Sequence, residues 1–507
     1  MTTPIFPTVR TGTEHHDHPR DLVPDAADGI DQPVEIDGRR RPLARWSRSL
    51  DHRHGDHQQD GEDRDGGPPR LVRWAGPLVV TGLLAAAAVR FLDNPEPPSN
   101  VTTPRTAADV IAGLEGAVAN RPDDLVAWQQ LGGAYLSRAA QTGDPSYYDQ
   151  AGAAFDQADR IYPDHPSSIV ARASLALSQH QFERALALGE KTLAQRPGNP
   201  ETLAVLVDAN VELGRYETAA DYSQQLLDAR PGVAALTRAS YQRELRGDRA
   251  GALTAMVAAE AAAGGEAAAF RGGDARPLVA LATVVALQGE ILFNGGRAED
   301  AATRYRRALE LAPDLTLAEV GLARADAAVG RTAIAIERLE RSVNRVPTLQ
   351  GATLLADLQR LAGVASTGDD LVDIIVQLQR SSGATIDLEL AVHLANRGRP
   401  DIALAETAFA AQPSIYGADA LAWSLTRAGR APEALPYVEQ SLKLGGGDAA
   451  LRAHAAMAFD AVGDAGRARD ELSLAFSTNP FFSFALRAEW SELASRLGVA
   501  VPPEWTP

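Results

Sequence analysis

The feature that most constrains this chain is a fixed spacing of prolines and glycines along it. Pro163, Pro197 and Pro231 follow one another at intervals of 34 residues, and Pro313 and Pro347 are separated by the same interval. Gly429 and Gly463 repeat the spacing further along. A fixed period of 20 to 50 residues is the signature of a solenoid built from stacked units. Each unit buries its apolar face against the next, so no unit is stable alone.

The residues between these prolines fit a helix-pair motif. Trp128, Leu131, Gly132 and Tyr135 match W-x2-L-G-x2-Y, and the run from Ala151 to Pro163 matches A-x3-F-x2-A-x4-P. Small residues at the glycine and alanine positions allow two helices to approach closely, whereas the large residues fill the space between units. Glycines at the turn inside each pair are predicted to take the left-handed conformation that ends a helix.

By these motifs the chain resembles the tetratricopeptide-repeat family over residues 105 to 480. The resemblance implies an all-α right-handed superhelical solenoid of nine or ten helix pairs. We divide it into a first sub-array, 105–264, a break at 265–281, and a second sub-array, 282–480. The unit at 348–382 departs furthest from the motif. Residues 481–507 are predicted to form a capping helix and a tail.

The segments before residue 105 have different compositions. Residues 1–70 carry ten arginines and fourteen acidic residues without apolar periodicity, which predicts a disordered tail. Leu71–Leu92 encloses a run without charge between Arg73 and Arg90, and we interpret it as one transmembrane helix. The arginines that precede it predict a cytoplasmic N-terminus and extracytoplasmic repeats. Residues 93–104 are rich in proline and are predicted to be a linker.

The resemblance also indicates which residues line the concave side of the superhelix, where the family binds peptides or proteins. The early part of this groove is predicted to be acidic and the late part aromatic. The predicted partner-binding residues are Gln129, Glu201, Asp208, Tyr241, Glu290, Phe293, Arg324, Tyr416, Asp419, Trp423 and Met457. Packing within the repeats is the alternative role for each aromatic residue, and an ordinary solvated helix face is the alternative for the acids. The lysine and asparagine clamp of the family's chaperone-binding members is not evident.

Composition and the absence of certain motifs argue against several classes of function. The formal net charge is −17, which makes nucleic acid an unfavourable partner. The chain has no cysteine, and it contains no phosphate-binding loop, H-E-x-x-H or G-x-S-x-G motif. We therefore expect no enzymatic activity, no cofactor and no metal centre in the repeats. The histidines of the tail leave open a metal-binding role for that segment.

The sequence thus predicts a membrane-tethered, non-enzymatic scaffold that binds an unidentified protein or peptide. Two alternatives stay open. One is an adaptor or assembly factor whose repeats face the cytosol beside a membrane complex. The other is a cell-envelope factor that binds a metal ion or a polymer.

Overall fold

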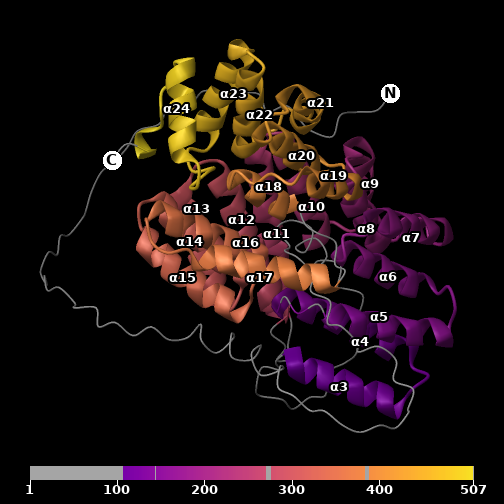
Figure 1. Ribbon diagram of the computed structural model, residues 1–507. Coiled ribbons are helices and arrows are strands. Elements are labelled where there is room, and N and C mark those ends of the chain that lie inside the picture. The colour runs from indigo at the N-terminus through magenta and orange to yellow at the C-terminus, as the bar shows by residue number, and fades with distance from the viewer. Residues whose placement is uncertain (1–106, 143, 145, 270–275, 383–387, 506–507) are drawn as a thin grey trace, which may run out of the picture. The chain divides into compact units, whose positions relative to one another are not determined.

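The structure, a computed structural model, describes residues 107–505 except for 143, 145, 270–275 and 383–387. The predicted tail, membrane helix and linker lie outside these residues. Within them the regular structure is helical (Figure 1). The helices are α3 (Ala107–Asn120), α4 (Leu125–Thr142), α5 (Ser146–Ile161), α6 (Pro166–Ser178), α7 (Phe182–Gln195), α8 (Pro200–Glu212), α9 (Tyr216–Ala229), α10 (Val233–Leu245), α11 (Arg249–Ala269), α12 (Arg276–Asn294), α13 (Ala298–Leu311), α14 (Thr316–Ala328), α15 (Thr332–Arg345), α16 (Leu349–Leu361), α17 (Thr367–Ser382), α18 (Leu388–Asn396), α19 (Ile402–Ala411), α20 (Ile415–Arg427), α21 (Ala431–Leu442), α22 (Ala449–Ala461), α23 (Ala465–Thr478), α24 (Arg487–Leu497) and the short 3-10 helix η2 (Pro503–Trp505).

From α4 to α23 the described helices form ten consecutive pairs. The two helices of a pair pack against each other, and most pairs also contact the pair that follows, as α5 does with α6 and α13 with α14. We call the first helix of each pair helix A and the second helix B. This arrangement confirms the predicted all-α helix-pair repeat.

The small residues of the motif bring helices A and B together. A Cβ atom added at Gly132 would lie 2.2 Å from the ring of Phe155, and one at Gly289 would lie 2.7 Å from the ring of Tyr305. Contacts that short do not occur between real atoms, so any side chain at either glycine would separate the pair. The glycines are therefore required for packing.

The turn between helices A and B takes a left-handed conformation, as the sequence predicts. Its glycines have φ values between +67° and +84° at Gly214, Gly296, Gly330, Gly398, Gly429 and Gly463. In the second pair the same place is taken by His180, which has a φ of +57°. A side chain makes this conformation less favourable, so this turn is strained relative to its counterparts.

The predicted break at 265–281 coincides with the end of α11 and the start of α12. One apolar cluster reaches across it, because Met256 and Ala263 of α11 pack with Val284 and Ile291 of α12. Among the described residues, Pro277–Asn294 is one helical segment long and apolar enough to cross a membrane, and half of it is buried. Here it serves as a core helix of the repeat stack. The division into two sub-arrays remains a prediction.

The end of the repeat stack is covered by α24, in the segment predicted to hold a capping helix. Trp490 and Leu493 of α24 are fully buried and share an apolar cluster with Leu472 and Phe476 of α23. The apolar face of the last pair is thereby removed from solvent.

The chain also makes contacts between residues about 200 positions apart. The amide N–H of Ile415 donates to the Tyr216 hydroxyl at 2.8 Å, and the Gln412 amide donates to the Glu212 carboxylate at 2.5 Å. Ile415 and Leu451 complete the same apolar cluster as Val207 and Val211. The segments 412–416 and 443–451 therefore cover helices α8 and α10.

Candidate functional site

The predicted groove residues of the first repeats form hydrogen bonds with other residues of the repeats. The Gln129 amide donates to the hydroxyls of Ser167 and Ser168, both at 2.8 Å. Glu201 accepts from the guanidinium of Arg230 at 2.9 Å, near the surface. The Gln129 contacts link one unit to the next, whereas the Glu201 contact joins the two helices of one pair.

Asp208 and Arg238 form a buried ion pair between helices α8 and α10. The guanidinium donates to both carboxylate oxygens, at 2.8 and 2.5 Å, and each residue is 1% exposed. Tyr241 also lies on α10 and packs against the same apolar cluster as Tyr416. Burial raises the pKa of both tyrosines well above the usual value. This part of the predicted groove is sealed by the chain's own later segments.

Three late groove residues belong to an aromatic cluster on α20 and α22. The Trp423 ring stacks on His454 with centroids 4.1 Å apart, and its indole N–H donates to Asn396 at 2.8 Å. His454 lies 2.9 Å from the Asp419 carboxylate. Met457 packs partly buried against the same cluster. Trp423 is fully buried, so its ring is not presented to a partner in this structure.

The remaining three predicted residues come together on α12 and α14. Glu290 accepts from the Tyr305 hydroxyl at 2.5 Å and from the Arg324 guanidinium. Arg324 also lies over the Phe293 ring, 4.3 Å from its centroid. Unlike the Asp208–Arg238 pair, this group borders a cavity.

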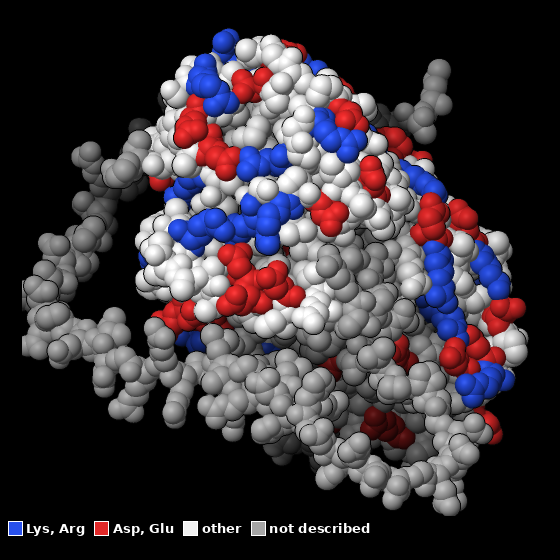
Figure 2. Space-filling model, viewed as in Figure 1, with Lys and Arg blue, Asp and Glu red and all other residues white. Residues whose placement is uncertain are grey.

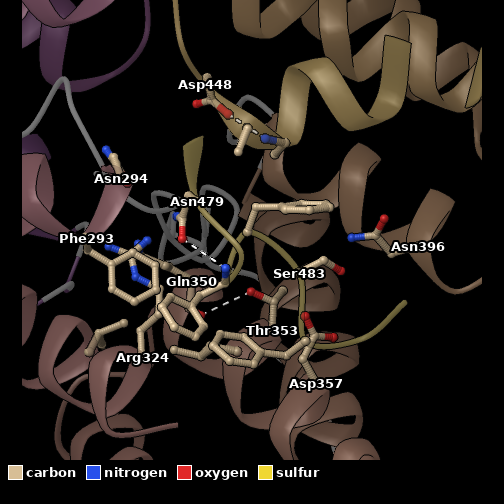
Figure 3. Close-up of a pocket in the computed structure, with 17 residues that line it drawn as sticks. Phe293, Asn294, Arg324, Gln350, Thr353, Asp357, Asn396, Asp448, Asn479 and Ser483 are labelled. Atoms are coloured by element: carbon tan, nitrogen blue, oxygen red, sulfur yellow. Dashed lines mark hydrogen bonds between the residues drawn. The ribbon is translucent and has the colours of Figure 1, made fainter. Parts of the chain in front are cut away.

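The cavity has a volume of about 280 Å³ and lies between helices A of five units and the segment that follows α23 (Figure 3). Its lining residues are polar or aromatic for the most part. They are Phe293, Asn294, Val320, Arg324, Gln350, Thr353, Leu354, Asp357, Asn396, Asp448, Ala449, Ala450, Asn479, Phe481, Phe482, Ser483 and Phe484. We call this feature the amide pocket, after Asn294, Gln350, Asn396 and Asn479.

The segment 479–484 forms one wall of the amide pocket because its phenylalanines are anchored in the repeats. Phe481 and Phe484 are buried among the apolar residues of α12 to α16, and the Phe481 ring lies 6.4 Å from the Phe293 ring. The Trp505 indole donates to the carbonyl of Pro480 at 2.6 Å and ties this segment to the C-terminal end. Sequence reasoning missed this wall. The phenylalanines that follow Pro480, where the repeat pattern stops, were the available signal.

Each charged side chain of the amide pocket has a partner within the chain. Asp357 lies 2.8 Å from the guanidinium of Arg397. Burial nevertheless raises the pKa of Asp357 from 3.8 to about 6, against the effect of Arg397. Asp448 accepts from the backbone N–H groups of Ala450 and Leu451 at the start of α22, and burial raises its pKa as well.

The surface of the repeats carries both charge signs. On the face shown in Figure 2, acidic and basic side chains are interspersed rather than gathered by sign. Arg172, for example, contacts both Asp156 and Asp159, and Arg345 contacts Asp314 and Glu319. Within the described residues, no group of three or more histidine or acidic side chains is placed to hold a metal ion.

Comparison with protein families gives one match to this architecture. The family described as tetratricopeptide repeat matches residues 176–239, from the end of α6 into α10. That stretch of the chain is therefore similar to the tetratricopeptide repeat. Comparison with curated proteins found no match.

The solved structures to which the chain is similar are distant in sequence. A tetratricopeptide repeat protein from Parabacteroides merdae is 13% identical with a TM-score of 0.35, over 55% of this chain and 92% of that one. The human IFIT1 dimer with PPP-AAAA is 15% identical with a TM-score of 0.42, over 78% and 94%. The P58(IPK) TPR domain is 15% identical with a TM-score of 0.25, over 77% and 93%. No functional conclusion follows from such values.

Proposed function

We propose that this chain is a non-enzymatic tetratricopeptide-repeat scaffold that binds a segment of a partner protein in the amide pocket. Repeats of this family typically bind protein or peptide partners on the helix A side. The supporting observation is that the chain's own segments cover α8 and α10, whereas a cavity remains beside α12, α14 and α16. The net charge of −17 favours protein over nucleic acid as the partner.

The experiment is site-specific photo-crosslinking in the full chain. A photoreactive amino acid at Gln350, which lines the amide pocket, is expected to give one discrete adduct in native membranes. The same group at Tyr162, which is 58% exposed and far from the pocket in sequence, is the control. Identical adducts at the two positions would contradict the proposal. So would the formation of adducts at Tyr162 but not at Gln350.

We further propose that Leu71–Leu92 tethers the scaffold to the membrane and that the repeats lie outside the cytoplasm. The charge-free run between Arg73 and Arg90 and the arginines before it support this proposal. Removing Leu71–Leu92 is expected to release the chain into the soluble fraction. Protease added to intact cells is expected to digest the repeats. Protection of the repeats would favour the cytosol-facing adaptor instead.

A further inference from the structure

Three arginines converge on the carboxylate of Asp326, in the last turn of α14. Guanidinium nitrogens of Arg331, Arg338 and Arg306 lie 3.0, 3.6 and 3.9 Å from its oxygens. Arg306 lies on α13, Arg331 in the turn between α14 and α15, and Arg338 on α15. Helix α14 packs against both α13 and α15 (Figure 1). We call these four residues the arginine cluster, and none of them lines the amide pocket.

The Asp326 carboxylate does not satisfy the donors that surround it. Arg331 donates one hydrogen bond to it from Nε, at 3.0 Å. The nearest nitrogens of Arg338 and Arg306 are too distant for a hydrogen bond. Nη2 of Arg331 and Nε of Arg338 are buried, and neither makes a hydrogen bond. Buried donors without an acceptor are unfavourable, so the cluster lacks an acceptor.

The arginine cluster also carries an excess of positive charge. Three guanidinium groups share one carboxylate, and within the described residues Arg306 and Arg338 form ion pairs with no other acid. Arg331 also lies 3.4 Å from Glu299, but the Glu299 side chain is 65% exposed and such a pair contributes little. The excess therefore amounts to about two positive charges, in a chain whose net charge is −17.

The preceding repeat shows that three arginines at one acid are not a requirement of the fold. Arg304 lies on α13, 34 residues before Arg338, and therefore holds the same place in the repeat. Its partner is Glu260, 3.7 Å away, and no second arginine among the described residues shares that carboxylate. At this position one arginine with one acid is consequently sufficient for packing.

We propose that the arginine cluster binds a dianionic phosphate group, either free phosphate or a phosphate monoester. A phosphate monoester carries a charge of about −1.5 to −2 at pH 7, which matches the excess of the cluster. Its oxygens suit the planar fork of guanidinium donors. The side chains of Arg306, Arg331 and Arg338 are 49%, 35% and 24% exposed, so an anion reaches them from solvent. Rotation of these side chains, without movement of the helices, brings the two unused donors to the phosphate oxygens.

This site goes beyond the proposed scaffold function and does not depend on it. The test is calorimetric titration of the full-length chain with end-blocked phosphoserine and, separately, with inorganic phosphate at constant ionic strength. Arg338→Gln and Arg306→Gln are each expected to weaken binding about fivefold, the effect of losing one partly exposed charge pair. Arg304→Gln is the matched control and is expected to leave binding unchanged. The probe that binds more tightly identifies the source of the phosphate group.

The pH dependence distinguishes a dianion from a general attraction of anions. Binding of phosphoserine is expected to weaken as the pH falls from about 7.5 to about 5, because the phosphate takes up its second proton near pH 6 while the arginines stay charged. An affinity that is constant over this range, an absence of binding by both probes, or equal losses in Arg304→Gln and Arg338→Gln would overturn the proposal. Thermal denaturation checks that each variant folds. Arg306→Gln decides the test if Arg338→Gln does not fold, since the Arg306 side chain is half exposed.

Discussion

Two stretches of the helix A face differ in what covers them. Around α8 and α10 the face is sealed: Asp208 and Arg238 are each 1% exposed, and Tyr216 accepts a hydrogen bond from Ile415. Around α12, α14 and α16 the face borders a cavity, and the ion pair of Glu290 with Arg324 is 14% and 22% exposed at its side chains. In both stretches an acid of one unit is therefore paired with an arginine of the next. The first pair is sealed inside the protein, and the second lies beside a cavity.

The largest expected effect separates the two ion pairs. Arg238→Met leaves the Asp208 carboxylate buried without its charge partner, so unfolding should become easier by about 3–5 kcal/mol. Arg324→Met should lower stability by about 1–2 kcal/mol, because Glu290 retains the Tyr305 hydroxyl. Chemical denaturation of both variants measures the difference. Equal losses of stability would mean that the two ion pairs are equally shielded from solvent.

Two glycines test the contact between the turn after α8 and the segment at Pro413 that covers it. Gly214 and Gly330 occupy the same turn position with φ values of +69° and +84°. A Cβ atom at Gly214 would lie 2.5 Å from the carbonyl oxygen of Pro413, whereas one at Gly330 would meet nothing within 4 Å. Both alanine variants should lose about 1–2 kcal/mol from the left-handed conformation. Gly214→Ala should lose about 1–3 kcal/mol more through the clash, as measured by thermal denaturation.

The pH dependence of stability should carry a contribution from the pocket. The pKa of Asp357 is about 6 in the folded chain, whereas the usual value for an aspartate, which we take for the unfolded chain, is 3.8. The folded chain therefore binds the proton more tightly. Its contribution is complete below pH 3.8 and is lost as the pH rises through 6. The change should be at most about 3 kcal/mol. It is measured as the difference between the wild type and Asp357→Asn from pH 4 to pH 7, and a constant difference would contradict it.

The smallest effect lies away from both stretches. His180→Gly relieves the left-handed conformation in the second pair and should raise the free energy of unfolding by about 0.5–1 kcal/mol. The His180 ring lies 5.6 Å from Phe182, and loss of this contact limits the gain. Denaturant unfolding checks the value. A loss of stability would show that the ring contact outweighs the backbone strain.

The sequence predicted the local structure well because the repeat period reports on neighbouring helices. The close approach at Gly132 and the left-handed turn at Gly214 both follow from the motif alone. The contact of Glu212 with Gln412 could not be predicted, because it depends on how many small rotations between units accumulate along the stack. The wall at 479–484 was missed since it begins where the repeat pattern ends.

The site was predicted only in part, because some of its residues lie outside the repeat motif. Phe293 and Arg324 were assigned to the groove from their motif positions, and they border the amide pocket. Asn294, Asn396 and Asn479 lie at or just beyond helix ends, outside the motif positions used for the groove. Whether the remaining predicted groove residues contact a partner stays a prediction.

The separation of 200 residues between Glu212 and Gln412 has a consequence during synthesis on the ribosome. At about 5–20 residues per second, roughly 10–40 s pass between the emergence of α8 and that of the segment that covers it. Through this interval the apolar surface around Val207 and Val211 lacks the cover that Ile415 and Leu451 provide in the folded chain. The nascent protein should therefore need shielding by a chaperone at this stage, and a pause in translation before residue 412 should increase its aggregation.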